Sequence, residues 1–151
     1  MEHLSAAQVR QFAEESFAGG LYCAESVVLS LARAQGIESD LLPKVATAFC
    51  GGMSRSCGTC GALTGAIMGL GLALGRSAPR ESALPSYRAT QRLIAQFEQE
   101  FGSRDCHVLL GCDLGSPEGQ AMFRDDSLAE LCLTYTGRAA EIAATLIAED
   151  R

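Results

Sequence analysis

The sequence has 151 residues, of which 48% are apolar and 20% charged. This is enough for a domain with a buried core, and it is too apolar for a disordered chain. Eighteen acidic and twelve basic side chains give a net charge of -6, and the basic residues are scattered along the chain without forming a stripe. The composition therefore excludes a nucleic acid as the expected partner.

The first third of the sequence predicts three amphipathic helices. Residues 5–20 begin with a capping box, in which Ser5 caps the helix and Gln8 reaches back to it, and they end at a glycine pair. Apolar residues recur at helical spacing over residues 23–36 and again over residues 40–52. A second and a third helix are therefore expected there.

Three more helices are predicted in the rest of the chain. Residues 60–75 form an apolar, glycine-rich fourth helix, and residues 84–102 form a fifth that ends at a glycine. The last helix covers residues 127–150 and is expected to begin with a capping box made by Ser127 and Glu130.

The pattern as a whole predicts an all-α fold. No alternating strand pattern of useful length occurs. Residues 75–86 are expected to form a long surface loop and residues 111–127 a second irregular stretch, and neither divides the chain. We expect residues 1–151 to form a single domain, a bundle of about six helices around a buried glycine-rich central helix.

The fourth predicted helix could also be read as a membrane span, because residues 56–75 carry no charge. Gly61, Gly65 and Gly69 add the spacing that lets helices pack closely. The many glycines dilute its hydrophobicity, however, and the neighbouring helices are amphipathic. We therefore expect no stable membrane insertion but a central helix whose glycine face is approached by another helix or by a dimer partner.

Seven cysteines are the most unusual feature of the sequence. The N-terminal residues show neither the basic nor the apolar region of a signal peptide, so a cytoplasmic location is predicted. In a reducing compartment many cysteines indicate metal binding or thiol chemistry rather than structural disulfides. They are Cys23, Cys50, Cys57, Cys60, Cys106, Cys112 and Cys132.

Cys57 and Cys60 form a CGTC pair at the start of the predicted fourth helix. Such pairs are typical of dithiol oxidoreductases, because unpaired N–H groups and the helix dipole lower the pKa of the thiol. The βαβ context of thioredoxin-like proteins is absent, so the pair indicates a chemistry but not that fold. Cys23 and Cys106 also lie at predicted helix starts, whereas Cys132 falls in a second turn. The alternative for any single cysteine is a small buried core residue.

Four segments together resemble a known protein family. They are LYCAESVVLSLA, VATAFCGGMSRSCGTCGALTGAIMGLGLALG, FEQEFGSRDCHVLLGCDL and LCLTYT, and they span about residues 20–135. In these segments the chain is similar to the C_GCAxxG_C_C family, a group of small bacterial and archaeal proteins to which a redox activity is ascribed. The family motif CGAxxG corresponds to residues 60–65.

The resemblance implies a helical fold and a shared thiol site, but it supplies no substrate, because the family's reaction is undefined. The four characteristic cysteines of the family correspond to Cys23, Cys60, Cys106 and Cys132. The family is often encoded near transporter genes, which implies a transporter-associated partner. Cys50, Cys57 and Cys112 are additions to the family pattern, and the roles of Cys50 and Cys112 stay open.

One apparent cofactor motif fails on inspection. The segment SRDCH ends like a c-type haem attachment site, but Ser103 stands where covalent attachment needs a first cysteine. His107 is therefore left outside the predicted site. The sequence also contains no phosphate-binding loop, dinucleotide fingerprint, zinc-protease motif or nucleophile elbow.

Two functions from different classes remain. In the first, a thiolate of low pKa at Cys60 or Cys57 attacks a disulfide or a persulfide, and the other member of the pair or Cys23, Cys106 or Cys132 resolves the mixed species. In the second, Cys23, Cys60, Cys106 and Cys132 hold an iron-sulfur cluster or a soft metal. The cofactor is accordingly none, a cluster or a metal ion. The expected partner is a redox or sulfur-transfer protein, with a homodimer left open.

Overall fold

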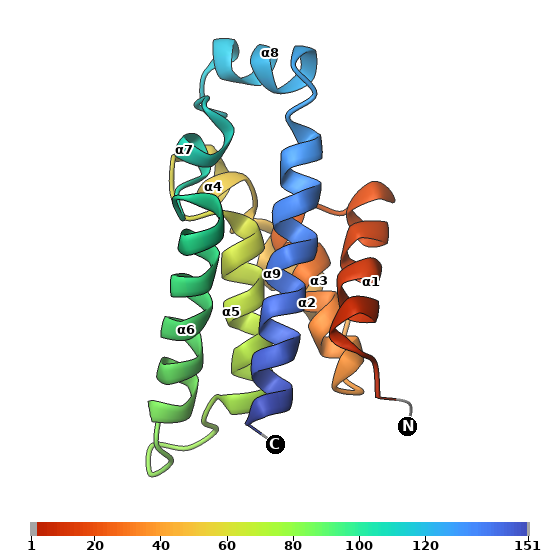
Figure 1. Ribbon diagram of the computed structural model, residues 1–151, viewed down its shortest axis with the longest axis vertical. Coiled ribbons are helices and arrows are strands. Elements are labelled where there is room, and N and C mark those ends of the chain that lie inside the picture. Colours follow the sequence, from red (N-terminus) through yellow and green to blue (C-terminus); the bar gives the residue numbers. More distant parts are fainter. Residues whose placement is uncertain (1–2, 151) are drawn as a thin grey trace.

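The six helices predicted from the sequence are all present in the computed structural model, which describes residues 3–150 (Figure 1). They are α1 (Ala6–Ala18), α2 (Cys23–Ala34), α3 (Leu41–Thr47), α5 (Gly61–Leu74), α6 (Leu84–Phe101) and α9 (Ala129–Glu149). Three shorter elements add to them, namely α4 (Cys50–Arg55), α7 (Cys106–Leu110) and α8 (Pro117–Asp125). The described residues contain no strand, and a single isolated bridge pairs Thr59 with Asp105. The fold is all-α, as the sequence predicted.

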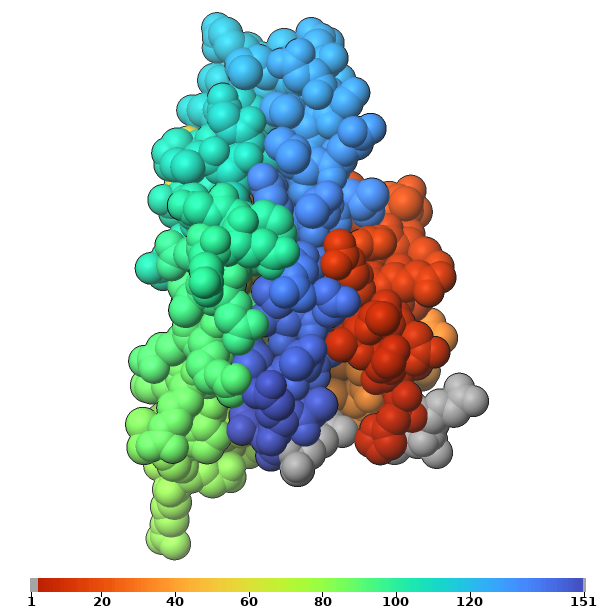
Figure 2. Space-filling model, viewed as in Figure 1, coloured from red at the N-terminus to blue at the C-terminus, as the bar shows by residue number. Residues whose placement is uncertain are grey.

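Helix α5 is the buried centre of the bundle. It packs against α2, α9 and α6, and its buried positions run from Gly61 to Leu70. Helix α1 packs on α9 and α2, so that α6, α9 and α1 lie side by side on the face seen in Figure 2. The predicted glycine-rich central helix is thereby confirmed.

The core follows from the apolar stripes of the surrounding helices. Leu93 and Phe97 of α6 are fully buried, as are Leu31 of α2 and Ile142 and Leu146 of α9. Because residues four apart lie on the same face of a helix, each stripe points at α5. Each such side chain contributes about 1.5–3 kcal/mol by leaving water.

The glycine face of α5 receives α2. A Cβ built on Gly65 would lie only 2.6 Å from the carbonyl oxygen of Ala24, and one built on Gly69 would collide with Leu31. Glycine therefore allows the two helices to approach more closely than any larger residue would. Of the two occupants predicted for this face, the structure shows another helix, which is α2 of the same chain.

None of the helices within residues 3–150 is both long enough and apolar enough to cross a lipid bilayer. Helix α5 has 14 residues, whereas a span needs about 20. Its lack of charge is explained by its burial among three other helices.

Two predicted helix boundaries are wrong. The spacing predicts a third helix over residues 40–52, but α3 ends at Thr47 because the following segment turns into the left-handed region, where Gly51 has φ 67°. The capping box of Ser127 and Glu130 does not form, since Ser127 has φ 55° and an N-cap needs extended backbone. Helix α9 consequently begins two residues later, at Ala129.

The stretch 111–127, expected to be irregular, contains α8. Its N-terminus is capped by Ser116, whose side chain accepts a hydrogen bond from Gly119 N at 2.9 Å, and Pro117 occupies the first helical position. The element lies across the upper end of the molecule, between α7 and the start of α9 (Figure 1). It thereby covers the end of the bundle where the cysteines gather.

Candidate functional site

A cavity of about 670 Å³ lies at the end of the bundle next to α8, and five of the seven cysteines line it. These are Cys23, Cys50, Cys60, Cys106 and Cys132. They come from five different elements, in order the first residue of α2, the first of α4, the N-cap of α5, the first of α7 and the fourth of α9. The fold therefore brings together thiols that lie up to 109 residues apart in the sequence.

The starts of α5 and α7 are held together by the isolated bridge between Thr59 and Asp105. Cys60 N donates a hydrogen bond to the carbonyl oxygen of Arg104 at 2.7 Å, and Cys106 N donates to that of Gly58 at 3.0 Å. Each of these cysteines begins the helix that follows. The bridge therefore places two thiol-bearing helix starts next to each other.

Two glycines make room for the thiols. A Cβ on Gly61 would collide with the sulfur of Cys23, and a Cβ on Gly52 would lie 2.5 Å from Cβ and 3.3 Å from Sγ of Cys106. The family motif CGAxxG thus carries its first glycine where a second cysteine sulfur rests. This contact gives that glycine a physical role in the site.

The wall between Cys50 and Cys57 is a left-handed turn. Five consecutive residues, Gly51 to Arg55, have φ between 60° and 69°, although left-handed helix costs non-glycine residues roughly 1–2 kcal/mol each. The carbonyl oxygen of Gly52 accepts hydrogen bonds from Ser56 N at 3.2 Å and Gly58 N at 2.9 Å. The turn leads the chain from the buried Cys50 to the exposed Cys57.

Cys50 packs against Cys23 at the N-terminus of α2. A hydrogen bond with Cys23 is the main cause that raises the pKa of Cys50, followed by burial, while the N–H groups of Glu25 and Ala24 lower it. The sequence left Cys50 without a role, and the Gly-Gly pair that follows it was the available signal for a sharp turn at the site.

Burial raises the pKa of three other thiols that line the cavity. It raises the pKa of Cys60 to about 12, of Cys106 to about 11 and of Cys132 to about 12, because a thiolate loses its hydration there. The N–H groups of Ala62 and Leu63 at the start of α5 lower the pKa of Cys60, but less than burial raises it. The predicted low-pKa thiolate at Cys60 is therefore wrong, since loss of water outweighs the helix N-terminus.

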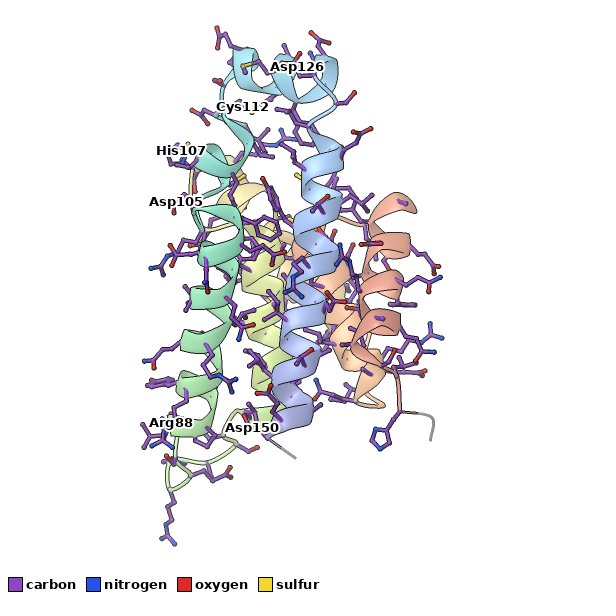
Figure 3. All side chains as sticks on the ribbon, in the orientation of Figure 1. Arg88, Asp105, His107, Cys112, Asp126 and Asp150 are labelled. Atoms are coloured by element: carbon purple, nitrogen blue, oxygen red, sulfur yellow. The ribbon has the colours of Figure 1, made fainter. Side chains whose placement is uncertain are left out.

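Cys57 and Cys112 do not line the cavity. Cys57 is exposed, and a hydrogen bond with Asp113 raises its pKa, contrary to the lowered value predicted for it. Cys112 is buried, and His107 lies on α7 near the same end of the molecule (Figure 3). The structure thus places the two members of the CGTC pair on different sides of the cavity wall.

Potential metal ligands are present near the cavity as free thiols. All seven cysteines are free thiols. Within residues 3–150, no three side chains of His, Cys, Asp or Glu are close enough together to hold a metal ion. The cysteines therefore converge on one cavity without forming a ready metal-binding group among the described residues.

Comparison with known proteins places the chain by its sequence. No curated protein and no solved structure matches it. A family model matches residues 21–146, and its description reads "Putative redox-active protein (C_GCAxxG_C_C)". The matched range contains all seven cysteines and every element that lines the cavity except the end of α1. The chain belongs to the C_GCAxxG_C_C family.

Proposed function

We propose that this protein exchanges thiols and disulfides in the cavity, where two of its cysteines reduce a disulfide substrate and become linked to each other. The observation that carries the proposal is the convergence of Cys23, Cys50, Cys60, Cys106 and Cys132, from five elements, on one cavity. A buried cysteine used only for packing needs no such common wall. Membership of a family described as redox-active supports the same chemistry.

Cys60 is the proposed attacking thiol. Its sulfur accepts hydrogen bonds from backbone N–H groups at the start of α5. The thiols of Cys106 and Cys132 lie close enough to affect its pKa. Because burial keeps the Cys60 thiol protonated at neutral pH, it gives up its proton as it attacks one sulfur of the substrate disulfide, and a mixed disulfide forms while the other sulfur leaves as a thiol. Cys106 or Cys132 then loses its proton as it attacks the Cys60 sulfur and releases the second half of the substrate as a thiol.

The electrons balance in this sequence. The substrate disulfide gains two electrons and leaves as two thiols, and the protein loses two electrons as one Cys–Cys bond forms. The two protons of the cavity thiols pass through water to the released sulfur atoms. A dithiol donor is needed to reduce the protein again, and we propose a partner redox or sulfur-transfer protein for that step.

The experiment uses reduced protein prepared without oxygen. One equivalent of oxidised glutathione is added, remaining thiols are alkylated, and the peptides are mapped by mass spectrometry. We expect two protein thiols to be lost per disulfide consumed, with a crosslink between Cys60 and another cavity cysteine. Glutathione attached to Cys57 alone, with no crosslink, would contradict the proposal.

A metal or cluster site is the second candidate, because the four family cysteines Cys23, Cys60, Cys106 and Cys132 all face the same cavity. Four thiolates are sufficient for an iron-sulfur cluster or a zinc ion. The sulfurs would have to approach one another, since the described residues offer no ready group of three donors. Stoichiometric iron with sulfide, or zinc, in the anaerobic protein would favour this candidate over thiol exchange.

A further inference from the structure

The cavity that holds the thiols has a mostly apolar wall. Leu109, Leu114 and Phe123 contribute to it, together with the cysteines themselves. Its volume of about 670 Å³ falls in the range of small-molecule sites, roughly 300–1,000 Å³. A mostly apolar cavity of this size suits a compact organic molecule.

The charged residues of the cavity are of one sign. Among residues 3–150, Arg55 and Arg124 line it and no acidic side chain does, although the chain has eighteen acidic and twelve basic residues. Both arginines are exposed, which places them at the mouth. Within residues 3–150 neither forms an ion pair, whereas Arg10, Arg92, Arg104 and Arg138 do so.

Both arginines lie within or next to α8. Arg124 lies in the last turn of α8. Arg55 ends the left-handed turn, and its carbonyl oxygen lies where a Cβ on Gly115 would come within 2.6 Å, so the turn packs against the segment leading into α8. Arg55 therefore lies near the start of α8 and Arg124 near its end, and both line the cavity.

We propose that the substrate of this cavity is a small organic disulfide that carries an anionic group, which Arg55 and Arg124 hold at the mouth while its apolar body lies against the wall. This inference rests on the proposed thiol exchange and names the substrate class for it. An uncompensated guanidinium attracts an anion and binds a carboxylate by paired hydrogen bonds. The disulfide bond then reaches the thiols and is reduced in the two-electron exchange described above.

Two aromatic disulfides of different charge test the proposal. Dithiobis(nitrobenzoate) is an aromatic disulfide with two carboxylates, and dithiodipyridine is a neutral aromatic disulfide. Both are applied to the Cys57→Ser protein, in which the exposed thiol outside the cavity is removed. We expect Arg55→Gln and Arg124→Gln each to slow the anionic reagent about fivefold and to leave the neutral one within about twofold.

Two further variants serve as controls. Arg88→Gln removes an exposed arginine at the opposite end of the molecule (Figure 3) and should change neither rate. Arg124→Lys keeps the charge, and most of the anionic rate should survive, whereas an unspecific disturbance of α8 would slow both reagents. Circular dichroism shows that each variant is folded.

The outcomes separate the two proposals. If both reagents oxidise the cavity cysteines but the glutamine variants slow them equally or not at all, the anionic substrate is refuted and the thiol exchange stands. If neither reagent crosslinks the cavity cysteines of the reduced protein, the thiol exchange itself is refuted, and the substrate class falls with it.

Discussion

Replacing Gly65 with alanine should force α2 away from α5. The new Cβ would lie 2.6 Å from the carbonyl oxygen and 2.9 Å from the Cα of Ala24, both of which are backbone atoms that no side-chain rotation can remove. Overpacking of this kind costs up to about 3 kcal/mol. Alanine regains about 1 kcal/mol through its higher helix propensity. We therefore expect the free energy of unfolding to fall by about 2 kcal/mol.

Gly71→Ala is the matched control, because it lies on the same helix and its Cβ would meet nothing within 4 Å. Only the propensity gain applies there, so this variant should be more stable than the parent by up to about 1 kcal/mol. Urea unfolding followed by circular dichroism measures both. For a chain of this length the melting temperatures should move by roughly 4–8 °C downward and 2–4 °C upward. Equal stability of the two variants would refute the close packing of α2 on α5.

Three further predictions concern the thiol site. Cys60→Ser should abolish crosslinking or metal binding and leave the helical circular dichroism unchanged. Cys112→Ser, which lies outside the cavity, should have only a small effect on crosslinking. A large effect of Cys112→Ser beside an unaffected Cys60→Ser protein would show that Cys60 is not the attacking thiol. Burial raises the pKa values of Cys60, Cys106 and Cys132 from about 9 to 11–12. Between about pH 9 and pH 11–12 these thiols therefore stay protonated in the native state but lose their protons in the unfolded state. Stability from these thiols is therefore complete only well below pH 9, and about 3 kcal/mol should be lost between pH 9 and pH 10, as urea titrations at both pH values would show; a flat profile would contradict the burial. Tyr135→Phe removes a hydroxyl that donates a hydrogen bond to the Leu109 carbonyl oxygen of α7 at 3.0 Å. It should lower the free energy of unfolding by about 1–2 kcal/mol, and an unchanged stability would show that water takes the place of the hydroxyl.

The helices could be predicted because their signals are local. Apolar spacing and capping residues, such as Ser5 with Gln8, act within a few residues, and the structure shows that capping box with both hydrogen bonds formed. The glycine face of α5 could also be predicted, because glycines spaced four residues apart, such as Gly65 and Gly69, indicate close helix packing. What local patterns determine, the sequence predicted well.

The chemistry of the site was less accessible because it depends on burial and on contacts distant in sequence. A helix start favours a thiolate in water, but the apolar cavity around Cys60 reverses that effect, and apolar surroundings are not visible in a motif. The position of Cys50 depends on a left-handed turn, which single-residue preferences do not predict for Met53 and Ser54. The cytoplasmic location, the partner protein and the catalytic roles stay predictions.

The contact between Cys23 and Gly61 also limits how this sequence can diverge over evolutionary time. The Cys23 sulfur occupies the volume that any side chain at position 61 would need. The residue at position 23 therefore constrains the residue at position 61. A lineage that keeps the thiol must keep the glycine, whereas loss of the thiol removes the severest contact at position 61 and leaves those with the backbone of Phe49 and Cys50. In an alignment of relatives, a residue other than glycine at position 61 should therefore occur only where position 23 is no longer cysteine.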